Sequence, residues 1–192
     1  MSADLGEVPP GQVATVVTFL EMTERPGQRE TPPSPLKLLH WPTVEPARYR
    51  ALFAAVGARW LWYSRLAMDD EELMASVGEV HEALDEAGRP AGFVELDFVS
   101  KSECLIRFLG LVPALAGRGH GRWLFAKTLA LAWRPGVERV RVHTCSLDHP
   151  AALPAYLRAG FHAVGRAFER FPDPRLVGLL PRDCAPQIPL IE

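Results

Sequence analysis

LGLVPALAGRGHGRWLF, residues 109–125, is the stretch that decides the fold. An apolar run ends at Pro113, glycines then alternate with Arg118 and His120, and a second apolar run follows Arg122. This order predicts a strand, a glycine loop and a helix. The first N–H groups of a helix have no partners within it, and glycines let an anion approach them closely. The stretch therefore predicts that a phosphate or a similar anion binds at the start of a helix.

Two common phosphate-binding motifs do not fit these glycines. A Walker A loop needs a lysine followed by serine or threonine, and residues 109–125 contain none of these. A Rossmann loop has GxGxxG early in the domain and an acidic residue about 20 positions later. Here the pattern is GxGxG, and it follows several predicted strands. Neither motif accounts for the stretch.

The composition places the chain among single-domain folded proteins. Its 192 residues can bury a sizeable core, and 48% of them are hydrophobic. A formal net charge of −2 argues against a dedicated nucleic-acid binder, and no apolar run approaches the length of a membrane helix. The cysteines form no CxxC pair, and the first residues carry no secretory signal. We therefore expect a cytoplasmic protein with reduced thiols and without nucleic-acid or membrane partners.

Turn residues and apolar periodicity divide the chain into strands and helices. Strands are predicted at 13–22, 103–113, 137–145 and 161–171, a β-hairpin at 79–99, and helices at 45–57, 69–78, 122–133 and 150–160. A proline-rich loop at 24–37 and a helical or turn-like aromatic segment at 58–66 lie between them. This order predicts an α/β layer fold with a mixed sheet. One domain would span 13–182, between a flexible N-terminus at 1–12 and an irregular tail at 183–192.

Two motifs in this order resemble those of the GNAT N-acetyltransferase superfamily. In that family an apolar strand end and x-Pro lead into [Q/R]-x-x-G-x-[G/A], which is similar to residues 109–125. DHPAALPAYLRAGF, residues 148–161, is similar to the family's N-x-x-A-x-x-x-Y-x-x-x-G-F. The resemblance covers 40–182 and is clearest over 105–161. It implies a GNAT-like three-layer fold, in which helices flank a central mixed, mostly antiparallel twisted sheet, and an acyltransferase that uses acetyl-CoA and no metal.

The resemblance also implies a role for each matching residue. Leu109, Gly110 and Leu111 would end the strand that pairs with the pantetheine arm of coenzyme A. Tyr156 would act as the general acid that protonates the departing thiolate. His149 stands at the motif's asparagine and would hydrogen-bond cofactor or substrate. The residues implied to cradle the pyrophosphate are Gly117, Arg118, Gly119, His120, Gly121 and Arg122.

The chain departs from the family pattern at three places, one of which is His149 in place of the asparagine. Ala116 stands where the family has glutamine or arginine, so one side-chain contact to phosphate is missing and Arg118 is a candidate substitute. Pro150 and Pro154 cannot both lie inside one regular helix. We therefore expect that helix to start late or to kink, with Tyr156 near its first turn.

The general base is a separate question, because the attacking amine must lose a proton and an ordinary alkylamine has a pKa of roughly 10. In GFVELDFV, strand alternation places Phe93, Glu95 and Asp97 on one face. We expect Glu95 to act as the base, directly or through water, with Asp97 and then Glu103 as alternatives. A solvated strand face is the structural explanation for the same carboxylates.

Other side chains permit a structural and a functional interpretation. Trp60, Trp62 and Tyr63 fit either a buried helix face or the wall of an acceptor pocket. His143, Cys145 and His149 would allow a metal site or a Cys–His nucleophile pair, and positions 143 and 145 share a strand face. The sequence offers no fourth ligand at zinc spacing and no sign of an activated thiolate, which argues against both.

These observations favour an acetyl-CoA-dependent N-acetyltransferase that transfers the acetyl group directly to a small-molecule amine. One alternative is an enzyme acting on a protein lysine or N-terminus. Another is a non-catalytic CoA-binding sensor or interaction module. A homodimer is compatible with either class, because symmetric dimers are common among soluble proteins.

Overall fold

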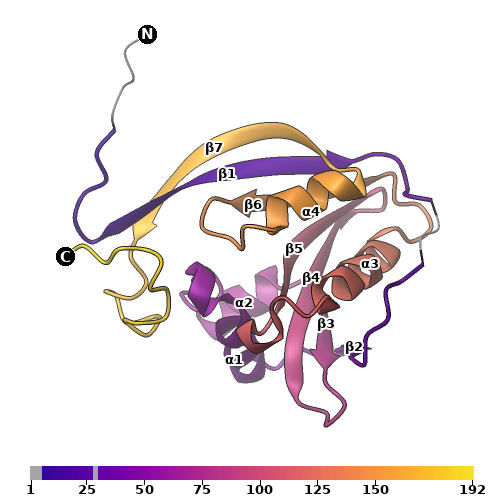
Figure 1. Ribbon diagram of the computed structural model, residues 1–192, viewed down its shortest axis with the longest axis horizontal. Coiled ribbons are helices and arrows are strands. Elements are labelled where there is room, and N and C mark those ends of the chain that lie inside the picture. Colours follow the sequence, from indigo (N-terminus) through magenta and orange to yellow (C-terminus); the bar gives the residue numbers. More distant parts are fainter. Residues whose placement is uncertain (1–5, 28–29) are drawn as a thin grey trace.

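The computed structural model describes residues 6–27 and 30–192 and contains both strands and helices. The strands are β1 (Gln12–Met22), β2 (Lys37–His40), β3 (Glu79–Leu84), β4 (Pro90–Ser100), β5 (Glu103–Leu111), β6 (Arg139–Cys145) and β7 (His162–Pro172). The α-helices are α1 (Pro46–Gly57), α2 (Asp70–Ser76), α3 (His120–Ala132) and α4 (Ala152–Ala159). The described strands form one seven-stranded sheet in the order β2-β3-β4-β5-β6-β1-β7 (Figure 1).

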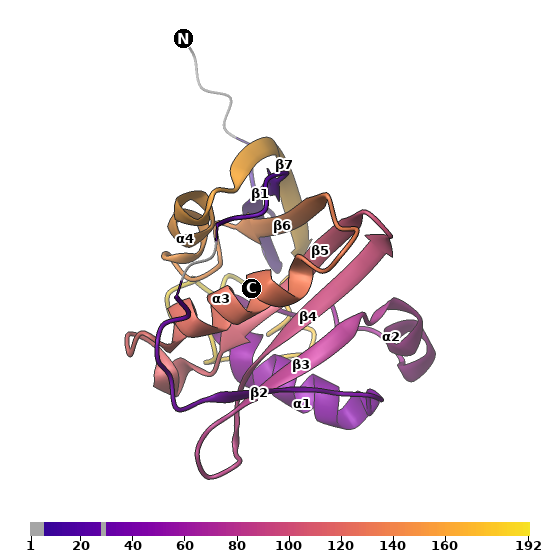
Figure 2. The same ribbon diagram turned by 90° about the vertical axis from the view of Figure 1, so that its right-hand side faces the viewer.

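The sheet lies between two helical layers, with α1 and α2 on one face and α3 and α4 on the other (Figure 2). Alternation along β4 explains this arrangement. Val94 and Leu96 pack into the core beneath α3, whereas Phe93 packs against Phe53 of α1. The predicted three-layer α/β fold and the predicted split of the two faces of β4 are both confirmed.

Strand directions confirm a mixed, mostly antiparallel sheet. β5 and β6 run parallel, and every other neighbouring pair of described strands is antiparallel. The first strand of the chain, β1, lies between β6 and β7, which are consecutive in sequence. The crossover through α4 therefore connects two strands that are separated in the sheet by β1.

The parallel pairing of β5 and β6 is short, so a gap forms in the sheet between the ends of these two strands. It begins at Glu103 and Arg139 and ends at Ile106 and Val142. On the opposite edge, β5 stays paired with β4 up to Leu111, with a register shift that leaves Arg107 as an extra residue. A bulge of this kind bends its strand. β5 and β6 therefore part beyond Ile106, and the sheet is split from there on.

A buried ion pair fastens the α1–α2 layer to the split sheet. The Glu95 carboxylate is fully buried and pairs with the buried guanidinium of Arg65. The Tyr49 hydroxyl and the Gly78 backbone N–H also donate to Glu95. Arg65 in turn donates to the Ser76 carbonyl at 3.0 Å. Burial and the Glu95 charge raise the pKa of Tyr49, so its hydroxyl remains a donor.

The Glu95→Ala variant should lose about 3–5 kcal/mol of unfolding free energy, because Arg65 then remains buried without a counter-charge. Chemical denaturation measures this loss. A double variant, Arg65→Met with Glu95→Leu, should recover most of it by replacing the pair with apolar groups. A loss below about 1 kcal/mol for Glu95→Ala would contradict the role of the pair.

The structure adds one strand and moves several boundaries relative to the sequence predictions. β2 was not predicted; it is four residues long and pairs at the sheet edge with β3. The α3 helix begins at His120, two residues before the predicted start. The α4 helix begins at Ala152 with Pro154 in its first turn, which confirms the late start.

A flexible N-terminus at 1–12 and an irregular tail at 183–192 were predicted to flank the domain, and both stay predictions. Of the N-terminus predicted to be flexible, residues 1–5 lie outside the described part. Residues 183–192 carry no helix or strand, but Ala185 is buried and its carbonyl accepts from Arg175. None of the described helices is long and apolar enough to span a membrane.

Candidate active site

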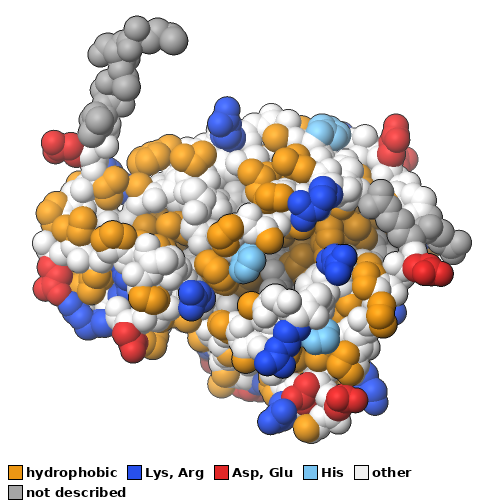
Figure 3. Space-filling model, in the orientation of Figure 1, with side chains coloured by type: hydrophobic (Ala, Val, Ile, Leu, Met, Phe, Trp, Pro, Cys, Tyr) orange, Lys and Arg blue, Asp and Glu red, His pale blue; other side chains and the backbone are white. Residues whose placement is uncertain are grey.

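A cavity of about 640 Å³ occupies the opening between β5 and β6. It is bounded by the ends of these strands, the glycine loop, α4 and the aromatic segment that follows α1. In the space-filling view its interior is largely hydrophobic and cationic side chains stand along its rim (Figure 3). The opening thus joins the predicted cofactor residues to the predicted acceptor residues.

One wall of the cavity is a strand edge with which none of the described strands pairs. Leu109, Gly110 and Leu111 all line the cavity. On their far side the backbone pairs with β4, where Leu111 faces Gly92. On the cavity side β6 has already diverged, so the backbone N–H and C=O groups of this edge remain available to a ligand. The predicted pairing segment is therefore where a ligand could extend the sheet.

The glycine loop connects this strand to α3, and Gly117, Gly119 and Gly121 line the cavity. Gly117 and Gly119 have φ of 75° and 84°, a left-handed conformation that glycine adopts without strain. Gly119 is the N-cap residue of α3. A Cβ at Gly117, Gly119 or Gly121 would meet nothing within 4 Å, so the space beside the loop is open. The helix dipole favours an anion in this space.

The cationic side chains of the loop have different positions. Arg122 lines the cavity, as does Arg158 of α4, which the sequence analysis did not single out. Arg118 is exposed and lies outside the cavity lining. The His120 ring nitrogen Nδ1 lies 3.0 Å from the Ser34 hydroxyl, so this side chain contacts the proline-rich loop. Like Arg118, His120 lies outside the cavity lining.

Tyr156 reaches the cavity from α4. It is 8% exposed, lines the cavity and packs edge-on against Phe125 and Phe161. It lies in the second turn of α4, slightly further along than predicted. Burial, and then the charge of Asp148, raise the pKa of Tyr156. The phenol therefore stays protonated at neutral pH, as a general acid must.

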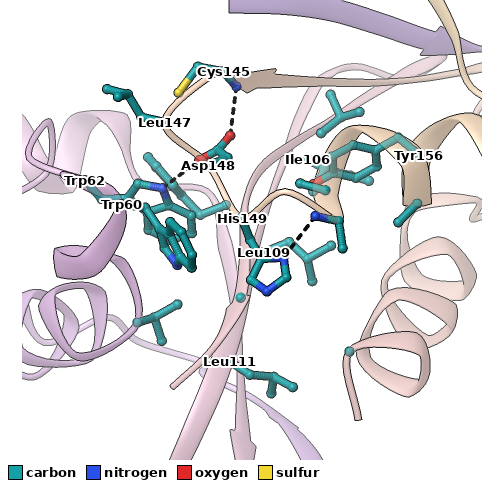
Figure 4. Close-up of a pocket in the computed structure, with 18 of the residues that line it drawn as sticks. Trp60, Trp62, Ile106, Leu109, Leu111, Cys145, Leu147, Asp148, His149 and Tyr156 are labelled. Carbon is teal, nitrogen blue, oxygen red and sulfur yellow. Dashed lines mark hydrogen bonds between the residues drawn. The ribbon is translucent and has the colours of Figure 1, made fainter. Parts of the chain in front are cut away.

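The turn between β6 and α4 brings Asp148 and His149 to the cavity (Figure 4). Asp148 accepts hydrogen bonds from Thr144 at 2.7 Å, from the Cys145 N–H at 2.9 Å and from the Trp62 indole at 3.1 Å. The sequence analysis missed this residue; its place directly after a predicted strand was the available signal. Asp148 thereby joins the aromatic segment to the opposite wall of the cavity.

His149 has a local role in addition to lining the cavity. Its Nδ1 accepts a hydrogen bond from the Ala151 N–H at 3.0 Å, at the start of α4. Its ring also lies edge-on to Trp60, with centroids 5.2 Å apart. The contact to cofactor or substrate predicted for His149 stays a prediction.

The aromatic segment does not form the predicted buried helix face, because its only helical part is the short 3-10 helix Ala58–Trp60 and its three aromatic side chains are half-buried. Trp60, Trp62 and Tyr63 all line the cavity. Trp62 also packs against Phe53 and Phe108, with centroids 5.6 and 5.2 Å apart, so it belongs to the core as well. These rings form an apolar wall at the end of the cavity away from the glycine loop.

A family comparison identifies the fold to which this site belongs. The family model described as "Acetyltransferase (GNAT) family" matches residues 36–161. The chain belongs to the GNAT family. This confirms the resemblance seen in the sequence, and it supports the prediction that the chain is an acyltransferase.

Solved structures with a similar fold include other GNAT proteins. A GCN5-related N-acetyltransferase from Sphaerobacter thermophilus matches with a TM-score of 0.59 and 17% identity, over 85% of this chain and 52% of that chain. A putative GNAT-family acetyltransferase from Novosphingobium aromaticivorans matches with a TM-score of 0.53 and 16% identity, over 85% and 67%. This chain thus spans about half to two thirds of these proteins. None of the curated proteins compared with it matches.

The predicted base does not lie in the cavity of this GNAT protein. Glu95 is fully buried between β4 and the α1–α2 layer, with three donors on its carboxylate, and it does not line the cavity. Asp97 is held by Arg107, and Glu103 pairs with Arg141. Strand alternation correctly predicted that Glu95 shares a face of β4 with Phe93, but the α1–α2 layer covers that face. The position of Glu95 therefore speaks against its role as base.

The structure gives no support to a metal site at His143, Cys145 and His149. Among the residues that the structure describes, no group of three or more His, Cys, Asp or Glu side chains could hold a metal ion. Burial and the Asp148 charge raise the pKa of Cys145, so this thiol is not activated as a thiolate.

Two substitutions in the glycine loop test whether its glycines are needed for their backbone conformation or only for their small size. Gly119→Ala should lower the unfolding free energy by about 1–2 kcal/mol, because alanine resists the left-handed conformation. Gly121→Ala, inside the first turn of α3 with open space around it, should be neutral or stabilising by up to about 1 kcal/mol. Thermal unfolding of the free protein tests this. Equal effects of the two substitutions would contradict the assigned backbone geometry.

Proposed function

We propose that this GNAT protein is an acetyl-CoA-dependent N-acetyltransferase that acetylates a small-molecule amine. One observation carries the proposal. The unpaired edge of Leu109–Leu111, the glycine loop and the Tyr156 side chain all border one cavity. A thioester lying along the strand edge would have its phosphates at the helix start and its sulfur beside a phenol.

Acetyl-CoA fits the residues present in this cavity. Its pantetheine arm has amide groups that match the free N–H and C=O groups of the strand edge. Its pyrophosphate suits the N–H groups at the start of α3, with Arg122 and Arg158 available for charge-assisted hydrogen bonds. These two arginines offset the contact that Ala116 does not provide. Acetyl-CoA is here a cosubstrate, and the proposal involves no metal.

The chemistry follows from these positions. The lone pair of the amine attacks the thioester carbonyl carbon, and a C–N bond forms as the carbonyl becomes an oxyanion. A backbone N–H of the free strand edge near Leu111 would stabilise that oxyanion. The C–S bond then breaks, and the Tyr156 hydroxyl would give its proton to the departing thiolate. The nitrogen, cationic since its attack, loses a proton to solvent as the amide forms, and solvent returns a proton to Tyr156. The acetyl group passes directly to the amine without an acyl-enzyme.

A small acceptor is favoured by the shape of the far end of the cavity. Trp60 and Trp62 stand there, and the hydrogen bond between Asp148 and Trp62 links the two walls. A protein segment would need an open groove at this end, whereas this hydrogen bond connects one wall of the cavity to the other. Transfer to a peptide lysine would instead support the alternative of a protein acceptor.

The Tyr156→Phe variant should reduce kcat for acetyl transfer by about 100-fold or more while acetyl-CoA still binds, because only the hydroxyl that supplies the proton is removed. Thiol release during turnover measures the rate. A matched control on the same helix is Leu157→Ala, since Leu157 is 47% exposed and does not line the cavity.

Full activity of Tyr156→Phe with an accepted amine would contradict the acid role. Binding has its own readout, because a ligand that binds only the folded state raises thermal stability. Failure of saturating acetyl-CoA to raise the unfolding temperature of the wild-type chain would contradict the cofactor assignment. Binding without turnover for any amine would favour the non-catalytic CoA-binding alternative.

A further inference from the structure

The cavity has a second end, on the face of the sheet opposite α3 and α4. Val142 of β6 packs into the core beneath α3. The next residue, His143, therefore points to the other face, and it lines the cavity directly beyond the last β5–β6 pair. Cys145 follows on the same face. A ligand at this end would meet β6 through His143 and would be separate from the glycine loop.

The same end carries a carboxylate from the neighbouring strands. Glu169 of β7 lines the cavity and faces Thr15 of β1 in the antiparallel ladder. Facing residues share one side of a sheet, so Glu169 and Thr15 both point into this end. Within the described part of the chain, Glu169 takes part in no ion pair or side-chain hydrogen bond. Its charge is therefore available to a ligand.

The remaining charges leave this end net negative. Arg107 borders it, but both its Nε and one terminal nitrogen donate to Asp97, at 3.1 and 2.6 Å. Asp148 also lines the cavity as a carboxylate fixed by three donors. With Arg107 neutralised by its partner, Asp148 and Glu169 dominate the local field. Such a site attracts a cation.

Aromatic side chains form the walls of the cavity around these charges. Tyr63 stacks on Phe171 with centroids 4.6 Å apart, and Phe108 lies 5.2 Å from Trp62. All four side chains line the cavity. Aromatic faces bind apolar groups and cations well, and they offer few partners to a hydroxyl-rich molecule. The wall and the carboxylates together suit an ammonium attached to an apolar body.

We propose that this end binds the acceptor as a cationic amine with an apolar, ring-containing body, whose ammonium is held by Glu169 and whose proton is accepted by His143. This inference rests on the N-acetyltransferase function proposed above and names its substrate class. The ammonium gives one proton to the neutral imidazole, and the free amine then attacks the thioester. The Tyr156 proton goes to the thiolate. The nitrogen, which becomes cationic when it attacks, loses its second proton to solvent as the amide forms. Solvent also removes the proton from His143 and returns one to Tyr156.

The protonation state of His143 agrees with this role. Burial within the cleft lowers its pKa below the ordinary histidine value, although solvent reaches the ring through the cavity. Asp148 and Glu169 raise this pKa and Arg107 lowers it, as the charged groups that face the ring from neighbouring elements. At neutral pH the imidazole is therefore uncharged and can accept a proton. Below its pKa it becomes protonated and can no longer do so.

An acceptor panel tests the substrate class. Thiol release at saturating acetyl-CoA is compared for 2-phenylethylamine, glucosamine and a lysine-containing peptide. The expected result is a kcat/KM for 2-phenylethylamine at least about tenfold above the other two. A preference for glucosamine or the peptide would overturn this inference and leave the N-acetyltransferase function intact.

Two variants test the assigned residues. Glu169→Gln should raise KM for 2-phenylethylamine about tenfold or more with little change in kcat, since it removes a charge that binds the amine. His143→Gln should mainly lower kcat, and this deficit should narrow as pH approaches the amine pKa of roughly 10, where the amine needs no base. The matched controls are Glu86→Gln and His162→Gln, which alter exposed groups outside the cavity lining. An unchanged KM for Glu169→Gln, or a deficit of His143→Gln that is independent of pH, would overturn the assignment.

A binding measurement keeps this inference distinct from the proposed function. Calorimetry records 2-phenylethylamine binding to the protein saturated with CoA, where no transfer can occur. Binding that Glu169→Gln weakens about tenfold supports the subsite even if no amine is acetylated. That combination would contradict the proposed function alone. Binding that is absent, or equal in wild type and Glu169→Gln, would overturn the subsite.

Discussion

The parallel pairing between β5 and β6 ends after Ile106 and Val142, and the whole site depends on this short ladder. The extra residue Arg107 bends β5 while β4 continues to hold its other edge up to Leu111. Backbone groups that would otherwise complete a sheet are left facing a cavity. Because unpaired backbone groups favour an extended partner, the split predisposes this edge to bind an amide-containing chain.

Two polar contacts hold the wall of the cavity that lies opposite the glycine loop. The buried pair of Glu95 and Arg65 holds the α1–α2 layer against β4, and the aromatic segment after α1 is thereby fixed in place. Asp148 then reaches across the cavity to the Trp62 indole. The walls are thus connected through the core and across the opening. A cavity fixed in this way positions two substrates without first paying the entropy of ordering its walls.

The sequence predicted the wall of the cavity formed by β5, the glycine loop and α3 better than the opposite wall. The strand, glycine loop and helix around residues 109–125 are adjacent in the chain, so local patterns were enough to predict them. Tyr156 was found through a second local motif. Glu95 shows the limit of such reasoning, because alternation assigns a strand face and cannot tell which helix covers it. The insertion of β1 between β6 and β7 is a long-range pairing that no local pattern encodes. For the same reason Glu169, which β1 and β7 bring to the cavity, was not predicted.

Amide hydrogen exchange with and without acetyl-CoA tests the central claim most directly, because it reports on the backbone groups of the split edge. If the cofactor extends the sheet at β5 and rests on the start of α3, exchange should slow in peptides that cover residues 107–122. Peptides from β2 and the β3–β4 turn, at the far edge of the sheet, should exchange at unchanged rates. Acetyl-CoA binding without protection over 107–122, or with protection confined to other parts of the chain, would contradict the account.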